Sequence, residues 1–203
     1  MRGLPKDREI EAIVPVYGER GDDTCIYLRD GRLLLAGVKK RAVLQALVRR
    51  RCKELSLVRA WSAARTHQKL GAPLAVSAEL VLAPYKAREA KVAGDETMGC
   101  VNVAALTRVV AEEAAGYAAS SAAQQCRTAG RRRSAVHGAR RGSTEHRKLQ
   151  QQVLLELRSG HRLPVLWGEA TVHRHLQAAR LVQADLQHEL DELLLYRLAS
   201  RGQ

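Results

Sequence analysis

The chain offers few residues whose types and spacing could perform catalysis. His173 and His175 flank Arg174 in a segment of helical periodicity, and a spacing of two residues places their side chains on different faces of a helix. His188 lies much further along, and no set of His, Cys, Asp and Glu has the spacing of a metal site. The sequence also lacks a nucleophilic serine motif and a glycine-rich phosphate loop. We therefore expect no metal and no catalytic centre of these classes.

The cysteines do not change this expectation. Nothing in the sequence favours a nucleophilic pair of Cys100 with His67 over a buried thiol. No stretch approaches the length of a membrane span, and the N-terminal residues lack the pattern of a signal peptide. We expect a cytoplasmic protein that is not an enzyme, needs no cofactor and does not bind membranes. Its reduced thiols, which form no CxxC pair, are Cys25, Cys52, Cys100 and Cys126.

The chemistry that the sequence does favour is the binding of a polyanion. The 203 residues carry a formal net charge of +13, with a pI near 10.2. Such an excess is typical of proteins that bind nucleic acid or an anionic surface. The alternative is a composition rich in Ala and Arg that has no binding role. The absence of Phe and the few other aromatic residues argue against RNA-recognition modules that stack bases on aromatic side chains.

Basic residues gather in three parts of the chain. The first runs from Arg41 to Lys53, the second covers 59–69, and the third lies near 127–148. Arg and Lys on loops beside a sheet contact phosphates and give affinity, and Arg can also read the shape of the minor groove. The predicted DNA-binding residues are Arg59, Arg65, His67, Lys69, Arg127, Arg131, Arg132, Arg133, Arg140 and Arg141.

The elements that position these residues follow from hydrophobic periodicity. The apolar, β-branched run 10–17 predicts a buried strand, and Asp30-Gly31 between two apolar runs predicts a hairpin. A helix is expected from Val38 to about Leu55, and a strand over 79–88. Residues 100–110 predict a short strand or turn that enters a helix. The expected core face of the first helix consists of Val43, Leu44, Leu47, Val48 and Leu55.

Residues 111–148 differ in composition from the rest of the chain. An Ala-rich run comes first, and 127–148 then carry eight cations against the single Glu145. With almost no large apolar side chains, this segment cannot bury enough surface to offset its ordering entropy, so we predict a flexible basic insertion in a single domain of residues 1–203. Two interpretations stay open: an arm that binds nucleic acid, or a surface loop without function.

A second hairpin precedes the C-terminal helix. Residues 156–170 repeat the pattern of 27–41, with Gly160 in the place of Gly31. A helix is then expected from Glu169 to about Leu198. Part of its apolar stripe must pack on the sheet, and the remainder either covers its own core or forms a dimer surface. The predicted class is α+β, with a mostly antiparallel sheet, a helix after each of two hairpins and a long C-terminal helix. The stripe consists of Val172, Leu176, Ala179, Leu186, Leu190 and Leu193.

Three segments taken in order, 24–48, 73–106 and 153–182, resemble the bacterial competence transcription factor (ComK) family. The same skeleton is similar to the LytTR DNA-binding domain, in which a "VN" pair precedes a hairpin of "LxxGxxLPV" type. Val101-Asn102 match the pair, and Gly160 and Leu163-Pro164 match the hairpin. The resemblance covers about three quarters of the chain and leaves out the insertion. It implies structural roles for these matched residues.

The resemblance implies a transcription regulator that binds promoter DNA, commonly as a dimer or a pair of dimers. LytTR-type domains contact DNA through His and Arg just before the "VN" pair, where this chain has "DETMG". The basic residues at 59–69 or in the insertion would then supply the contacts. We expect a sequence-selective, homo-oligomeric regulator that binds double-stranded promoter DNA through basic loops, with no small-molecule substrate. The alternatives are a protein-interaction adaptor that uses the C-terminal helix, and a basic protein associated with RNA or the ribosome.

Overall fold

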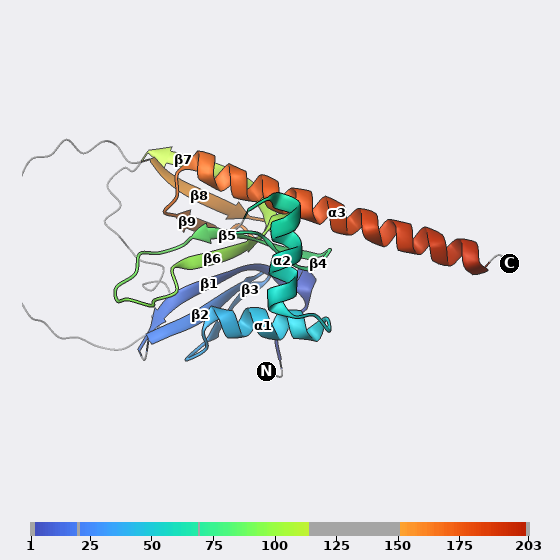
Figure 1. Cartoon of the computed structure of the whole chain (residues 1–203). Helices are drawn as coiled ribbons and strands as arrows, with labels where there is room; N and C mark the ends of the chain where they lie inside the picture. Colours follow the sequence, from blue (N-terminus) through green and yellow to red (C-terminus); the bar gives the residue numbers. More distant parts are fainter. Residues whose placement is uncertain (1–2, 20, 69, 114–150, 202–203) are drawn as a thin grey trace, which may run out of the picture.

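The computed structural model describes residues 3–19, 21–68, 70–113 and 151–201, which form two antiparallel sheets and three α-helices (Figure 1). This confirms the predicted α+β class. The larger sheet has the order β3-β2-β1-β6-β5-β4, and the smaller sheet has the order β7-β8-β9. The bounds are β1 (Ile10–Gly18), β2 (Gly21–Leu28), β3 (Gly31–Leu35), β4 (Leu74–Ser77), β5 (Leu80–Lys86), β6 (Met98–Asn102), β7 (Leu106–Glu113), β8 (Gln151–Leu157), β9 (Arg162–Val165), α1 (Lys40–Arg50), α2 (Leu55–Thr66) and α3 (Glu169–Arg201), with the 3-10 turns η1 (Asp7–Glu9) and η2 (Val103–Ala105).

Both predicted hairpins are present, and each is followed by a helix. Asp30-Gly31 joins β2 to β3, where Leu28 pairs with Gly31, and α1 follows β3. Gly160 lies in the turn between β8 and β9, and α3 follows β9. Both glycines have a positive φ, +146° and +82°, as such turns require. The repeated sequence pattern therefore forms a β-hairpin in each case, and a helix follows each hairpin.

The larger sheet is covered on both faces. Ile13 pairs with Ile26 and with Cys100, so these three side chains share one face, which α1 and α2 cover (Figure 1). Ala12 pairs with Tyr27 and belongs to the other face. There, the turn between β8 and β9 places the ring of His161 edge-on to Tyr27, 5.3 Å between ring centroids.

The helical region between the two sheet halves differs from the prediction. All five residues of the expected core face are buried, but α1 ends at Arg50 and Leu55 begins a second helix. Cys52 has a φ of +54° and ends α1, and the amide of Lys53 donates to the Val48 carbonyl, as in a glycine-type C-cap. The basic residues at 59–69 were expected on a loop, but the residues up to Thr66 belong to α2. Only Leu55, Val58 and Ser62 of this helix are buried, so its apolar face is too narrow to be recognised in the sequence.

Residues 106–113 also correct the prediction, because they form strand β7 where a helix was expected. The buried side chain of Asn102 accepts from the Ala104 amide and donates to the carbonyls of Ile10 and Glu79, so it fixes the turn η2. The chain then pairs with β8 from Leu106 to Glu113. Pairing with a distant strand decides the conformation here. Residues 111–113 belong to this strand, and the remainder of the predicted insertion lies outside the described residues.

Helix α3 begins on the body of the protein and extends well past it (Figure 1). Val172, Leu176 and Ala179 are buried, as predicted. No described helix is long and apolar enough to cross a membrane. Towards its C-terminal end α3 carries exposed apolar side chains, among them the last two residues of the predicted stripe: Leu190, Leu193, Leu194, Leu195, Tyr196 and Leu198.

Gly71 fits closely against α3. Its carbonyl lies 3.2 Å from Nδ1 of His175, and the His175 ring stacks on Trp167 at 4.6 Å between centroids. Burial lowers the pKa of His175, and the contact with the Gly71 carbonyl opposes this shift only in part. A Cβ atom at Gly71 would lie 2.8 Å from Cε1 of His175, which the stacked ring cannot easily avoid.

We predict that Gly71→Ala destabilises the protein more than Gly37→Ala. Both glycines have a similar positive φ, +70° and +66°, but nothing lies within 4 Å of a Cβ at Gly37. The Gly37 variant should lose about 1 kcal/mol from backbone strain alone. The Gly71 variant should lose a further ~1–3 kcal/mol from overpacking. Urea unfolding measures the loss of stability in each variant. In a His175→Ala background, the additional loss of the Gly71 variant should disappear. Equal losses would contradict the proposed clash.

Candidate nucleic-acid interface on α1 and α2

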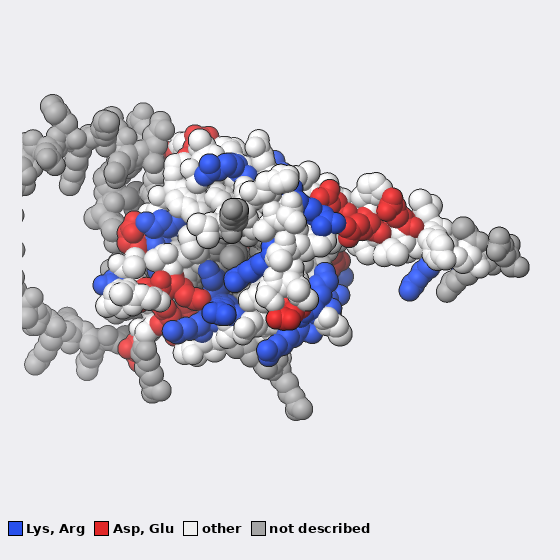
Figure 2. All heavy atoms as spheres, viewed as in Figure 1, with Lys and Arg blue, Asp and Glu red and all other residues white. Residues whose placement is uncertain are grey.

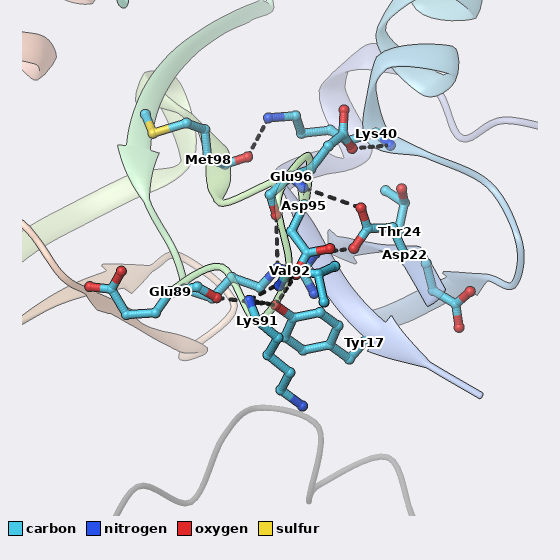
Figure 3. A network of polar contacts seen from close by, with 12 residues as sticks. Tyr17, Asp22, Thr24, Lys40, Glu89, Lys91, Val92, Asp95, Glu96 and Met98 are labelled. Carbon is cyan, nitrogen blue, oxygen red and sulfur yellow. Dashed lines mark hydrogen bonds and ion pairs between the residues drawn. The ribbon is translucent and has the colours of Figure 1, made fainter. Parts of the chain in front are cut away.

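The N-terminus of α1 is capped from a distant loop. The preceding residue, Lys39, contributes no side-chain cap. Instead the Glu96 carboxylate accepts from the backbone amides of Lys40 (2.8 Å) and Arg41 (3.3 Å), as Figure 3 shows for Lys40. A carboxylate at this position accepts hydrogen bonds from free backbone amides and interacts favourably with the positive end of the helix dipole. The loop 87–97 therefore sets where α1 begins.

This loop is itself held against the β1–β2 hairpin (Figure 3). Arg88 forms a largely buried ion pair with Asp22 and lies 3.7 Å from the centroid of the Tyr17 ring. The Tyr17 hydroxyl donates to Asp95 at 2.6 Å. Hydrogen bonds from Tyr17 and from the Val92 amide lower the pKa of Asp95, and desolvation, together with the bond to Asp95, raises the pKa of Tyr17. The loop is thus fixed by charge and hydrogen bonding.

The opposite end of α1 is held by a buried acid. Asp7 pairs with Arg50 and with Arg51 (2.7 Å), and it accepts from the Ser77 hydroxyl at 2.8 Å. Burial raises the pKa of Asp7, but these hydrogen bonds outweigh the effect and hold it below its usual value. Arg50 and Arg51 are therefore structural cations, and two of the basic residues at the end of α1 are already neutralised.

Three other arginines surround a small cavity between α1 and α2. We call this cavity of about 190 Å³ the arginine pocket. Arg41, Gln45 and Arg49 follow one another at four-residue steps on α1, which places them on one side of the helix. None of the three guanidinium groups in the pocket forms an ion pair within the described part of the chain. The full lining is Arg41, Gln45, Arg49, Glu54, Leu55, Ser56 and Arg59.

The N-terminus of α2 lies in the same pocket. The first amide to bond within α2 is that of Val58, which donates to the Glu54 carbonyl at 3.0 Å, and no side chain caps the turn before it. Free amides and the positive end of the dipole favour an anion here. The negative charge of Glu54 makes anion binding less favourable, since its carboxylate lines the pocket and accepts a hydrogen bond from the Ser56 hydroxyl at 2.6 Å. Three cations against one anion leave a net charge of +2, suited to a phosphate group.

The structure separates the predicted DNA-binding residues. Arg59 lines the arginine pocket, and His67 is exposed just past the end of α2. Arg65 lies over the Trp61 ring at 3.7 Å and pairs with Asp185 and Glu189 on α3, so its guanidinium would have to leave two carboxylates to meet a phosphate. The other predicted residues lie outside the described part of the chain: Lys69, Arg127, Arg131, Arg132, Arg133, Arg140 and Arg141.

Sequence reasoning noted the basic run from Arg41 to Lys53 but did not select Arg41 and Arg49 as site residues. Their spacing of eight residues, with Gln45 halfway, was the available signal, because it places them on one side of a helix. Figure 2 shows Lys and Arg side chains gathered over α1 and the adjoining end of α2, whereas acidic side chains gather along α3. Other Lys and Arg side chains lie scattered over the rest of this face.

Comparison with known proteins adds nothing to this geometry: no protein-family model, no curated protein and no solved structure matches the chain. Within the described residues, no group of three or more His, Cys, Asp and Glu could hold a metal ion. The arginine pocket is the feature of these residues that is best suited to a polyanion.

We predict that sulfate stabilises the protein through this pocket. Sulfate at about ten times its dissociation constant should add about 1.4 kcal/mol, which raises Tm by roughly 3–6 °C over chloride at matched ionic strength. The Arg49→Gln variant should lose this gain. Arg29→Gln is the matched control, because Arg29 is exposed on the β2–β3 hairpin, away from the pocket. A gain that persists in Arg49→Gln would place sulfate elsewhere.

Proposed function

We propose that the chain is a cytoplasmic DNA-binding transcription regulator that contacts the phosphates of duplex promoter DNA through α1 and α2. The observation that carries this proposal is the arginine pocket, where Arg41, Arg49 and Arg59 form no ion pair with any described residue and lie beside the free amides of α2. Cations that have no internal partner are available to release the counterions of DNA. Phosphate contacts of this kind position a protein on the duplex, and promoter selectivity needs further contacts in a groove.

The likeness to the ComK family and to LytTR-type domains supports this proposal. The matched residues have the structural roles expected of them: Asn102 is buried at the turn η2, and Gly160 lies in the β8–β9 turn. The "DETMG" segment, which stands where LytTR-type domains have DNA-contacting residues, here holds Glu96 against the start of α1. Phosphate contacts from α1 and α2 would replace the contacts that this segment lacks.

The exposed end of α3 supports the expected homo-oligomer. Leu193, Leu195 and Tyr196 are each more than 60% exposed, although side chains of this size are seldom exposed as a contiguous group. Pairing this end with a second copy would place two basic surfaces on one DNA. The same observation supports the second candidate function, a protein-interaction adaptor. Sedimentation separates the two: a monomer that stays monomeric with DNA would favour the adaptor.

We predict opposite effects of two substitutions on DNA affinity. Arg49→Gln should weaken binding to duplex DNA about 3- to 10-fold near 0.1 M salt and lower the salt slope by about one unit. Glu54→Gln should strengthen binding a few-fold, because it removes the carboxylate that would face the phosphate. Fluorescence anisotropy with promoter fragments and with unrelated duplexes measures affinity and selectivity together.

The matched control for these variants is again Arg29→Gln, which should leave affinity within twofold of the unmodified protein. Equal losses in Arg29→Gln and Arg49→Gln would show that only the total charge matters. A dissociation constant weaker than about 10⁻⁴ M at low salt would remove the DNA-binding function altogether. Tighter binding to single-stranded RNA than to duplex DNA, in one salt series, would favour the RNA-associated alternative.

We also predict that deleting 127–148 flattens the salt dependence of DNA binding. This segment contributes +7 of the chain's net charge of +13, since it holds eight cations and one glutamate. Each phosphate that it neutralises should add about 0.9 to the slope of log affinity against log salt. An unchanged slope in the deletion variant would show that the segment does not contact DNA.

A further inference from the structure

A second, larger cavity lies beside the arginine pocket. It has a volume of about 750 Å³ and extends from α1 and α2 to β5, β6 and the start of α3. Its walls are mostly apolar, with Leu44 on α1, Leu82 and Pro84 on β5, and Trp167 just before α3. Size and lining both match the sites in which proteins bind small molecules, which are concave, mostly apolar and served by a few polar groups.

One of these polar groups is a buried cation that forms no ion pair with a described residue. Lys40, at the start of α1, lines the cavity and is only 9% exposed. Its Nζ atom donates to the Met98 carbonyl (Figure 3), and no carboxylate in the described part of the chain forms an ion pair with it. The nearby Glu96 carboxylate is bound to the backbone amide of Lys40. An ammonium group has three donors, so two remain for another partner.

A buried charge that lacks a partner is unfavourable, and proteins retain one chiefly where it has a function. Lys40 therefore differs from Asp7, the buried acid at the other end of α1, which pairs with two arginines. An anion that reaches into the cavity would supply the counter-charge that Lys40 lacks among the described residues. The two open donors of Lys40 suit the anionic head group of such a molecule, and the apolar wall suits an apolar body.

Arg59 adds a second cation at the same cavity. It lines the wall on α2, and the Cys100 thiol lies near both cations. Lys40, Arg59 and Cys100 all line this cavity. Burial raises the pKa of Cys100, the charges of Lys40 and Arg59 oppose that rise, and the charge of Glu96 adds to it. The cavity thus has a cationic end and an apolar body. A neutral apolar molecule would leave that cationic end unused.

We propose that this cavity binds a small molecule with an anionic head group and an apolar body, such as a medium-chain carboxylate. The head group meets Lys40 and Arg59, and the body lies against Leu44, Leu82 and Trp167. This inference does not depend on the proposed DNA-binding function, because the cavity, its lysine and its apolar wall exist without DNA. A binding assay without DNA therefore tests it alone.

The test compares decanoate with decanol on the full chain by isothermal titration calorimetry. The two probes share an apolar body and differ in the head group. Decanoate should bind, and Lys40→Met should weaken its binding about 10- to 100-fold, the range for a lost charge-assisted hydrogen bond. Lys40→Met keeps an apolar chain in place of the lysine stem, so decanol binding should change less than threefold. Retained decanol binding also shows that the variant is folded.

The matched control is Lys39→Met, which removes the same charge one residue away, where the side chain is exposed and outside the cavity. It should leave decanoate affinity within twofold. Emission from Trp167 in a Trp61→Phe background gives a second readout, since these are the two tryptophans of the chain. Equal effects of both lysine substitutions, or no binding of either probe up to about 1 mM, would overturn the proposal.

Discussion

The position of α1 depends on the carboxylate of Glu96, which accepts from the first two amides of the helix. Hydrogen bonds to a charged acceptor are stronger than neutral ones, and here the acceptor comes from a loop 55 residues further along the chain. Arg88 and Asp95 hold that loop against the first hairpin. Because α1 carries both Lys40 and Arg49, the same hydrogen bonds fix the positions of the two cationic sites.

Seven cations on or next to α1 and α2 fall into two groups with different physical roles. In the first group, Arg50, Arg51 and Arg65 each meet an acidic side chain, so they tie η1 to the end of α1 and α2 to α3. In the second group, Lys40, Arg41, Arg49 and Arg59 meet no such partner in the described part of the chain, and they adjoin one another between α1 and α2. Counting cations in the sequence does not separate these groups, because the distinction lies in which acid the fold places beside each cation.

Local patterns in the sequence predicted the elements whose environment is local. The buried apolar run of β1, the Asp30-Gly31 turn and the apolar face of α1 all appear where composition, periodicity and turn chemistry predicted them. Two strands were not predicted. Strand β7 forms because β8 pairs along it, and β4 was missed because its four residues are too short for a periodic signal.

The candidate sites required the same long-range information. The spacing of Arg41 and Arg49 could be read from the sequence, but their approach to Arg59 depends on the turn at Cys52 and on how α2 crosses α1. The burial of Lys40 is even less visible in the sequence, where it is one of many basic residues between 39 and 53. Only the packing of α1 on β1 and β2, together with the hydrogen bond from Lys40 to the Met98 carbonyl on β6, distinguishes it from its exposed neighbour Lys39.

The two cationic sites are neighbours for a simple geometric reason. Lys40 and Leu44 form one row of side chains along α1, and Arg41, Gln45 and Arg49 form the next row, which is turned by the ~100° that one residue adds to a helix.

Arg59, on the facing helix, lines both the large cavity and the arginine pocket. An anion in the cavity would lower the positive potential in the arginine pocket, and its head group would compete for the same guanidinium. Under the two proposals made above, the binding of a small anion and the binding of DNA are therefore linked through one side chain, and linkage of this kind acts equally in both directions.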